Sequence, residues 1–157
     1  MDALAEMIIV GVIAIVVLDL WQLALKLLFG VPSGNWAHLG RWVSHFTRGR
    51  LYHRAIGEAE PFRYEAATGW IVHYGTGVIY AAIYLILMRD FLDREPGLLS
   101  AILFGLATLA APWFLMQPGM GLGVAARNAE APWAVRAKNL MTHTVFGLGL
   151  YLGVLIA

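Results

Sequence analysis

The chain has 157 residues, of which 60% are hydrophobic and only 13% carry a charged side chain, and its mean hydropathy is +0.69. This composition lies outside the range of soluble domains and predicts an integral membrane protein. The absence of cysteine excludes disulfides, thiolate metal sites and cysteine nucleophiles, while the net charge of +1 becomes informative only when the charges are assigned to the two sides of a membrane.

Four apolar segments are long enough to cross a bilayer as helices, which takes about 20 residues for a hydrocarbon core of about 30 Å. They cover residues 7–29, 66–88, 98–117 and 139–157. Because these segments use most of the chain, we expect one domain, residues 1–157, whose fold is all-α: an integral membrane four-helix bundle.

The basic residues are unevenly divided between the two sides of such a bundle. If the spans alternate in direction, nine of the eleven Lys and Arg residues fall in or beside the loops 30–65 and 118–138, and only Arg89 and Arg94 fall on the opposite side. The positive-inside rule then places both loops in the cytoplasm and both termini outside. The chain starts with acidic residues where a signal peptide has basic ones, so we expect the first span to remain in the protein.

The first span carries polar residues in its second half. Asp19, Gln22 and Lys26 fall on one face of the helix. Lys26 is close enough to the boundary for its ammonium group to reach the lipid headgroups. Asp19 lies roughly ten residues, or ~15 Å, from the helix end. At that depth an acid costs about 2.5–3.5 kcal/mol unless it is protonated or paired, which indicates either a functional site or a specific partner.

Residues 36–48 predict an additional amphipathic helix that lies in the membrane interface between spans 1 and 2. Its apolar face is formed by Trp36, Leu39, Val43 and Phe46, and its basic face by His38, Arg41, His45 and Arg48. We expect anionic lipids to contact the arginines Arg41, Arg48, Arg50 and Arg54. A metal or nucleic-acid site made from His38, His45 and His53 is less favoured, because a seven-residue spacing puts two histidines two helical turns apart. We expect no nucleic-acid partner.

The second span has one small and polar face. Six residues recur at three- and four-residue spacing and form it: Gly69, His73, Thr76, Gly77, Tyr80 and Tyr84. The opposite face is aliphatic and consists of Val72, Ile79, Ile83 and Ile86. Since glycine allows helices to approach closely and polar groups find no partner in lipid, we expect the first face to pack against other helices. The short turn 90–96 predicts that spans 2 and 3 are antiparallel neighbours.

The third span contains Pro112, which removes a backbone hydrogen bond and predicts a kink. The glycine-rich segment that follows has neither the strand nor the Lys-Ser/Thr pair of a phosphate loop, and it favours a re-entrant or interfacial cover. In the fourth span Gly149 and Gly153 form a small-xxx-small pair, which predicts a homodimer contact.

Three stretches together point to a relationship. They are E-x-E-P-F-R-x-E-x-x-x-G-W-x-x-H-Y-G-T-G (58–77), M-Q-P-G-M-G-x-G-x-A-A (116–126) and N-L-x-T-H-T-V-F-G-x-G-L-Y (139–151). Over nearly its full length the chain resembles a bacterial family of small four-span membrane proteins that is catalogued as a domain of unknown function. The resemblance supports the span count and implies the bacterial inner (plasma) membrane, and it carries no activity with it. In that membrane the positive-inside orientation makes both termini periplasmic.

Ionisable and polar residues concentrate in the cytoplasmic half of the predicted bundle. Asp19, His73 and His143 lie within about two turns of one another in depth. The predicted ligand or proton site consists of Asp19, Gln22, His73, Thr76, Gln117, Asn139 and His143. A carboxylate beside histidine can exchange protons near neutral pH. We therefore expect a polar pocket that binds or transports a small solute or ion with proton coupling.

Other readings of the same residues stay open. The polar residues can act as structural contacts between helices in a structural or assembly protein without a ligand. Two further alternatives are a b-type haem held by His73 and His143, and a metal ion held by Asp19, His73 and His143. No nucleophile and base occur at motif spacing, so catalysis has the least support.

Overall fold

The computed structural model describes residues 2–157, and every regular element in that range is a helix. The long helices are α1 (Ala3–Phe29), α3 (Glu65–Ile86), α4 (Leu98–Ala107) and α6 (Pro132–Ile156). Four stretches are long and apolar enough to cross a membrane: Ala3–Phe29, Glu65–Phe91, Leu98–Gly119 and Pro132–Ile156. The all-α fold with four helical stretches able to cross a membrane is therefore confirmed, and the fourth stretch begins seven residues before the expected residue 139.

The described chain divides into two compact units. Unit 1 contains residues 2–33, 74–108 and 140–157, and unit 2 contains residues 34–73 and 109–139. Helices α3 and α6 each supply residues to both units. The single domain expected from the sequence stays a prediction.

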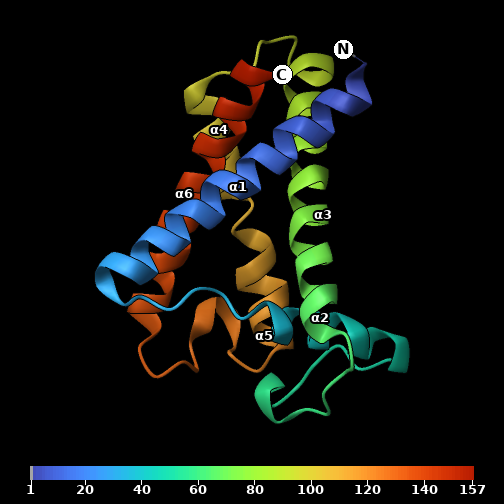
Figure 1. Cartoon of the computed structure of the whole chain (residues 1–157), viewed down its shortest axis with the longest axis vertical. Coiled ribbons are helices and arrows are strands. Elements are labelled where there is room, and N and C mark those ends of the chain that lie inside the picture. Colours follow the sequence, from blue (N-terminus) through green and yellow to red (C-terminus); the bar gives the residue numbers. More distant parts are fainter. Residues whose placement is uncertain (1) are drawn as a thin grey trace. The chain divides into compact units, whose positions relative to one another are not determined.

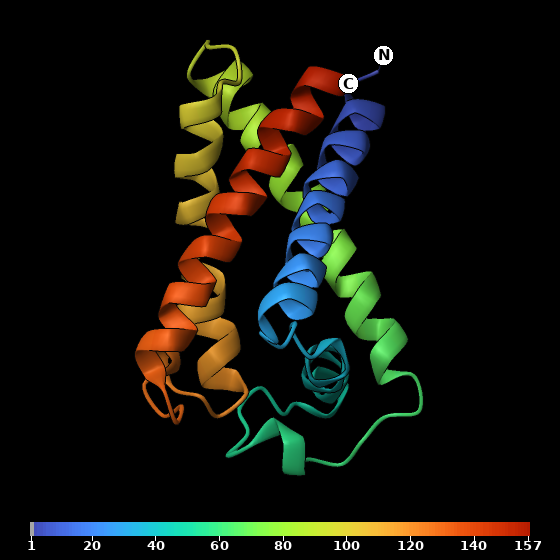
Figure 2. The ribbon, with the colours of Figure 1, turned by 60° about the vertical axis from the view of Figure 1, so that its left-hand side comes forward.

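Unit 1 is a bundle of four helices: α1, the second part of α3, α4 and the second part of α6. The start of α1, the short connection between α3 and α4, and the end of α6 lie at the same end of this unit (Figures 1 and 2). Near that end Arg89 forms an ion pair of 2.7 Å with Glu6. The long helices of unit 1 that follow one another along the chain therefore run antiparallel, and for α3 and α4 the short connection requires it.

Glycines let α1 approach its two neighbours. An added Cβ on Gly11 would come within 2.5 Å of Val78 on α3, and one on Gly149 within 2.8 Å of Ala14 on α1. Gly153 repeats the second contact against Val10, at 2.8 Å. Both glycines of the predicted dimer motif thus pack within the chain, because a backbone without side chains allows close helix contact. The homodimer itself stays a prediction.

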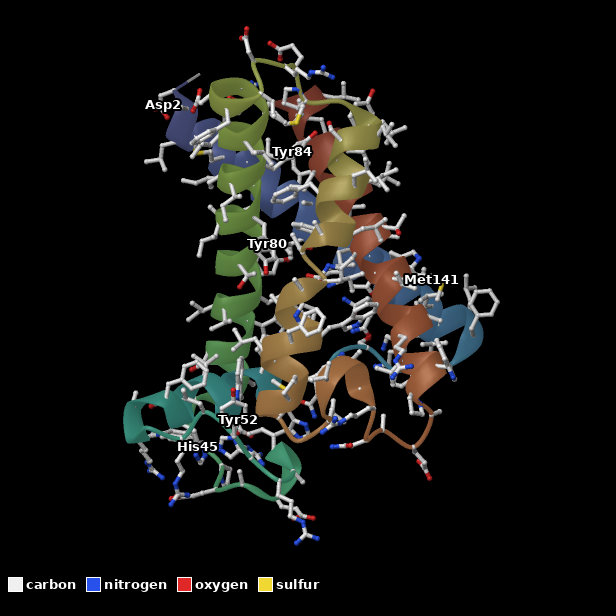
Figure 3. The ribbon with its side chains drawn as sticks, turned by 180° about the vertical axis from the view of Figure 1, so that it is seen from behind. Asp2, His45, Tyr52, Tyr80, Tyr84 and Met141 are labelled. Carbon is white, nitrogen blue, oxygen red and sulfur yellow. The ribbon has the colours of Figure 1, made fainter. Side chains whose placement is uncertain are left out.

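The tyrosines of α3 meet α4 in the interior of unit 1. Tyr80 and Tyr84 extend from α3 toward α4 (Figure 3), and the ring of Tyr84 lies 5.3 Å from that of Phe104. Tyr84 is completely buried, and its hydroxyl lies 2.9 Å from the hydroxyl of Ser100. The small and polar face of α3 therefore packs inward, as the sequence predicts, while Ile79 and Ile83 are exposed. Val72 is an exception, because it packs against the apolar cluster of unit 2.

The third span is not one continuous α-helix. Regular α-geometry ends at Ala107, a π-helix covers Pro112–Met116, and the short α5 (Gln117–Gly119) follows. Proline has no backbone N–H, and its ring clashes with the preceding turn, so it disfavours an unbroken helix. The disturbance predicted at Pro112 is confirmed.

Unit 2 is built around α2 (Trp36–Ser44) and a 3-10 turn that continues it over His45–Arg48. This confirms the additional helix over residues 36–48. Its apolar side chains pack within the protein, in a cluster that contains Leu39, Trp42, Ile56 and Met120. Two shorter 3-10 turns, Ile56–Glu58 and Val124–Ala126, belong to the same unit.

Glycine also fixes the contact between α2 and the first turns of α3. A Cβ on Gly40 would lie 1.8 Å from the carbonyl oxygen of Glu65, and one on Gly69 would lie 1.8 Å from that of Trp36. The basic face expected for α2 is not free, since Arg41 retains 12% exposure and His45 is fully buried. The sequence pattern placed both residues on the basic face of the helix and does not reveal the acceptors that surround them.

Candidate functional site

Two of the polar contacts between helices of unit 1 involve residues of the predicted site. At the contact of α1 with α3, the hydroxyl of Tyr74 donates to a carboxylate oxygen of the half-buried Asp19 over 3.1 Å. Gln22 lies one turn further along α1 and is 7% exposed, and Thr76 is half-buried on α3. The predicted acid is therefore held by a neutral hydroxyl from the neighbouring helix.

The second pair joins α4 and α6. The hydroxyl of Thr108 donates to the carbonyl oxygen of Gly105 over 2.6 Å. Nδ1 of His143 lies 2.7 Å from the Thr108 oxygen and 3.2 Å from the Gly105 oxygen, so this nitrogen carries the hydrogen and donates. A histidine in this arrangement is fixed in one tautomer and links the two helices.

In unit 2, His73 is part of an aromatic group. Its ring stacks on that of Trp36 with centroids 3.8 Å apart and planes inclined by 23°, and the ring of Trp70 lies 5.7 Å away. His73 is 7% exposed. Within residues 2–157 no three histidine, aspartate or glutamate side chains gather as they would around a metal ion. The structure thus gives no support to the three-residue metal site.

Among the predicted site residues, Gln117 has a buried side-chain oxygen that forms no hydrogen bond within the described residues. Its side chain is 3% exposed, and its carbonyl oxygen Oε1 has no hydrogen-bond partner in the described chain. The indole nitrogen of Trp113 is likewise buried and without a partner. Asn139, the remaining predicted residue, is half-buried at the position where α6 passes from unit 2 to unit 1.

Trp113 and Gln117 are four residues apart and therefore share one face of the helix. The backbone N–H of Gln117 donates to the carbonyl of Pro112, five residues earlier. This is the hydrogen bond of a π-helical turn. A hydrogen-bond donor and an acceptor are therefore placed one turn apart, and π-helical turns of this kind often occur at functional sites.

One network in unit 2 was not predicted from the sequence. Arg41 forms a two-pronged ion pair with Glu65, with both N–O distances 2.8 Å. Its third nitrogen donates to the carbonyls of Ile56, Gly57 and Ala59 over 3.0 to 3.2 Å. The hydrogen bond to Glu65 raises the pKa of Arg41. Glu65 stands in the first of the three motif stretches, which was the available signal, but the sequence does not show that Arg41 is its partner.

Arg41 therefore ties α2, the loop that follows it and the start of α3 together. The arginines Arg50 and Arg54 remain exposed, whereas Arg48 pairs with Glu60 and lies 4.7 Å from the ring centre of Phe62. Contact of Arg41, Arg48, Arg50 and Arg54 with anionic lipids stays a prediction.

The chain has no match among curated proteins or among solved structures. A family model matches residues 8–157, which is nearly the whole chain and all four spans. The chain therefore belongs to the family described as "Protein of unknown function (DUF2938)".

Proposed function

We propose that the protein binds a small polar solute within its membrane-spanning segments, through Trp113 and Gln117 of unit 2. The observation that carries the proposal is the buried Oε1 of Gln117, which has no partner in the described chain. An unpaired buried acceptor costs about 1–3 kcal/mol, and native proteins tolerate few of them. A bound solute would remove this cost.

The two side chains define what such a solute must offer. The indole N–H of Trp113 requires an acceptor, and Oε1 of Gln117 requires a donor one turn away. A hydroxyl, carboxylic acid or amide group supplies both. A neutral solute fits best, because burying a charge within a membrane-spanning segment costs much more than burying a neutral polar group.

Native mass spectrometry of the protein in detergent tests this proposal. We expect the wild-type protein to carry a small molecule that Gln117→Leu loses and that Trp113→Phe holds more weakly. The matched control is Gln22→Leu, which removes a buried glutamine of unit 1. This variant should keep the bound molecule. A wild-type protein without a bound molecule, or equal retention by all variants, would contradict the proposal.

A second function, proton exchange at Asp19, is favoured by the hydrogen bond from Tyr74. This hydrogen bond places the carboxylate at the contact of two membrane-spanning helices, and an intramembrane acid is a functional residue by default. We propose that Asp19 takes up and releases a proton during solute binding. Infrared difference spectra on acidification should show a carboxylic C=O band that is missing from Asp19→Asn and displaced in Tyr74→Phe. An unchanged spectrum in Asp19→Asn would exclude this role.

We also propose the orientation in which loops 30–65 and 118–138 face the bacterial cytoplasm and both termini face the periplasm. The uneven division of basic residues supports it. A reporter fused after Ala157 should be active only as a periplasmic reporter, and one inserted at Asn128 only as a cytoplasmic one. Reversed signals would invert the orientation.

A further inference from the structure

His45 and His53 are neighbouring imidazoles in unit 2. His45 starts the 3-10 turn after α2, and His53 lies in the loop that follows. Their ring centroids are 4.7 Å apart and their planes are perpendicular. His45 is fully buried and lies among the ribbons of α2 and the loop after it (Figure 3).

The surrounding carbonyls fix which nitrogen of each ring carries a hydrogen. Nε2 of His45 lies 2.9 Å from the carbonyl oxygen of Glu60, and Nδ1 of His53 lies 3.3 Å from that of Gly119. A carbonyl only accepts, so both nitrogens donate. In a neutral imidazole the other nitrogen then holds a lone pair. These are Nδ1 of His45 and Nε2 of His53, and both are buried without a partner in the described chain.

We infer that His45 and His53 bind a divalent late transition metal ion, of the Zn²⁺ or Cu²⁺ class, through these two nitrogens. Histidines that bind metals usually donate their second ring N–H to a backbone carbonyl or a carboxylate, as both do here. A tetrahedral ion with metal–nitrogen bonds of about 2.0–2.1 Å places two imidazole centroids about 5 Å apart. The observed 4.7 Å fits this requirement.

The donor set also defines the type of site. Imidazole suits zinc, copper and nickel better than magnesium or calcium, which prefer oxygen ligands. Glu60, whose backbone carbonyl accepts from His45, has its carboxylate held by Arg48. Because residues 2–157 contain no cluster of three such ligands, the ion keeps positions open for water or an exogenous ligand.

The course of the loop after α2 brings His53 beside His45, a pair that helical spacing does not predict. His38 and His45 belong to one helical segment and are two turns apart. His53 instead arrives on a loop whose backbone is tied to the third span, since its N–H donates to Gly119 over 2.8 Å and that of Ile56 donates to Met120 over 3.1 Å. His38 is half-buried beside Gly57 and serves as the control.

The experiment uses the full-length protein in detergent, without a histidine tag and after chelator treatment, with Cu²⁺ and Zn²⁺ as probes. Calorimetry should give one ion per chain, and the electron paramagnetic resonance spectrum of Cu²⁺ should show coupling to two nitrogens. We expect His53→Asn to lose at least ten-fold in affinity and one nitrogen coupling, and His38→Asn to match the wild type.

His45→Asn should behave as His53→Asn does, but it alters a fully buried residue and can prevent folding. His53 is half-buried, so its variant tests the inference separately. No saturable binding by the wild-type protein, or wild-type affinity in His53→Asn, would overturn the inference. Equal losses in His38→Asn and His53→Asn would also overturn it, because binding would then not depend on this pair.

Discussion

Unit 1 and unit 2 are each stabilised internally by a different kind of interaction. In unit 1, helices approach closely through glycines such as Gly11 and Gly105. In unit 2, one guanidinium, that of Arg41, serves a carboxylate and three backbone carbonyls. Helices in lipid gain little from burying apolar surface and depend on close packing. Loop-rich structure must instead satisfy its backbone polar groups. We therefore expect different kinds of substitution to destabilise the two units.

The largest effect should follow from Arg41→Met. The change leaves Glu65 as a largely buried carboxylate without its counter-charge, and it leaves three carbonyls with one donor fewer. Breaking a buried ion pair by removing one partner costs about 3–5 kcal/mol. We expect hydrogen exchange to speed up in residues 36–65 before it does in α1 or α4. Arg41→Lys should not rescue unit 2, because an ammonium group cannot form the two-pronged pair.

Arg48→Met is the matched control for this prediction. Arg48 also pairs with a glutamate, but its side chain is 46% exposed and that of Glu60 is 64% exposed. Exposed ion pairs contribute about 0–1 kcal/mol. Equal destabilisation by the two arginine variants would show that burial does not distinguish them.

The next largest loss of stability should follow from replacing a glycine of unit 1. A Cβ on Gly105 would lie 2.4 Å from the carbonyl oxygen of His143, so Gly105→Ala must push α4 and α6 apart. Overpacking of this kind costs about 1–3 kcal/mol. Gly75→Ala is the control, because nothing lies within 4 Å of its added methyl group. That variant should gain up to about 1 kcal/mol from helix propensity. Denaturation in mixed micelles measures the stability of both variants. Destabilisation by Gly75→Ala would contradict the packing argument.

The difference between the helix packing of unit 1 and the loop contacts of unit 2 also explains how much the sequence alone could predict. The face of α3 that contains Gly77 and Tyr84 was predicted because helical periodicity determines which residues share a face. Its inward orientation followed from the properties of glycine and polar groups in lipid. The four spans followed from length and hydropathy. All of these are local signals, and unit 1 is formed mainly by helices that obey them.

Unit 2 was predicted less well because its decisive contacts are not local. Arg41 and Glu65 are 24 positions apart, and the pattern around Arg41 is that of a solvent- or lipid-facing residue. His53 meets His45 only because the loop returns against Gly119. For the candidate site, the sequence singled out Gln117 as a polar residue in a span. It could not show that Oε1 lacks a partner, since that depends on every neighbouring side chain.

A smaller effect of opposite sign is expected from Gln117→Leu. Replacing an unpaired buried acceptor by an apolar group of similar size removes its desolvation cost. We expect the solute-free protein to be stabilised by about 1–2 kcal/mol, measured by thermal denaturation after extensive detergent exchange. Destabilisation would mean that Gln117 already has a partner inside the protein, and it would weaken the proposed solute site.

The smallest effect should come from Tyr74→Phe, which removes the hydrogen bond to Asp19 and leaves the packing of the ring in place. Hydrogen bonds between membrane helices contribute about 0.6 kcal/mol on average and at most about 1.7 kcal/mol. We therefore expect a loss near the lower value, several-fold smaller than that of Arg41→Met, when unfolding is followed in mixed micelles. This result would show that unit 1 depends on close packing and that the Asp19–Tyr74 pair is not retained for stability. A loss above about 2 kcal/mol would exceed the range for such bonds and would make the pair a structural contact of unit 1.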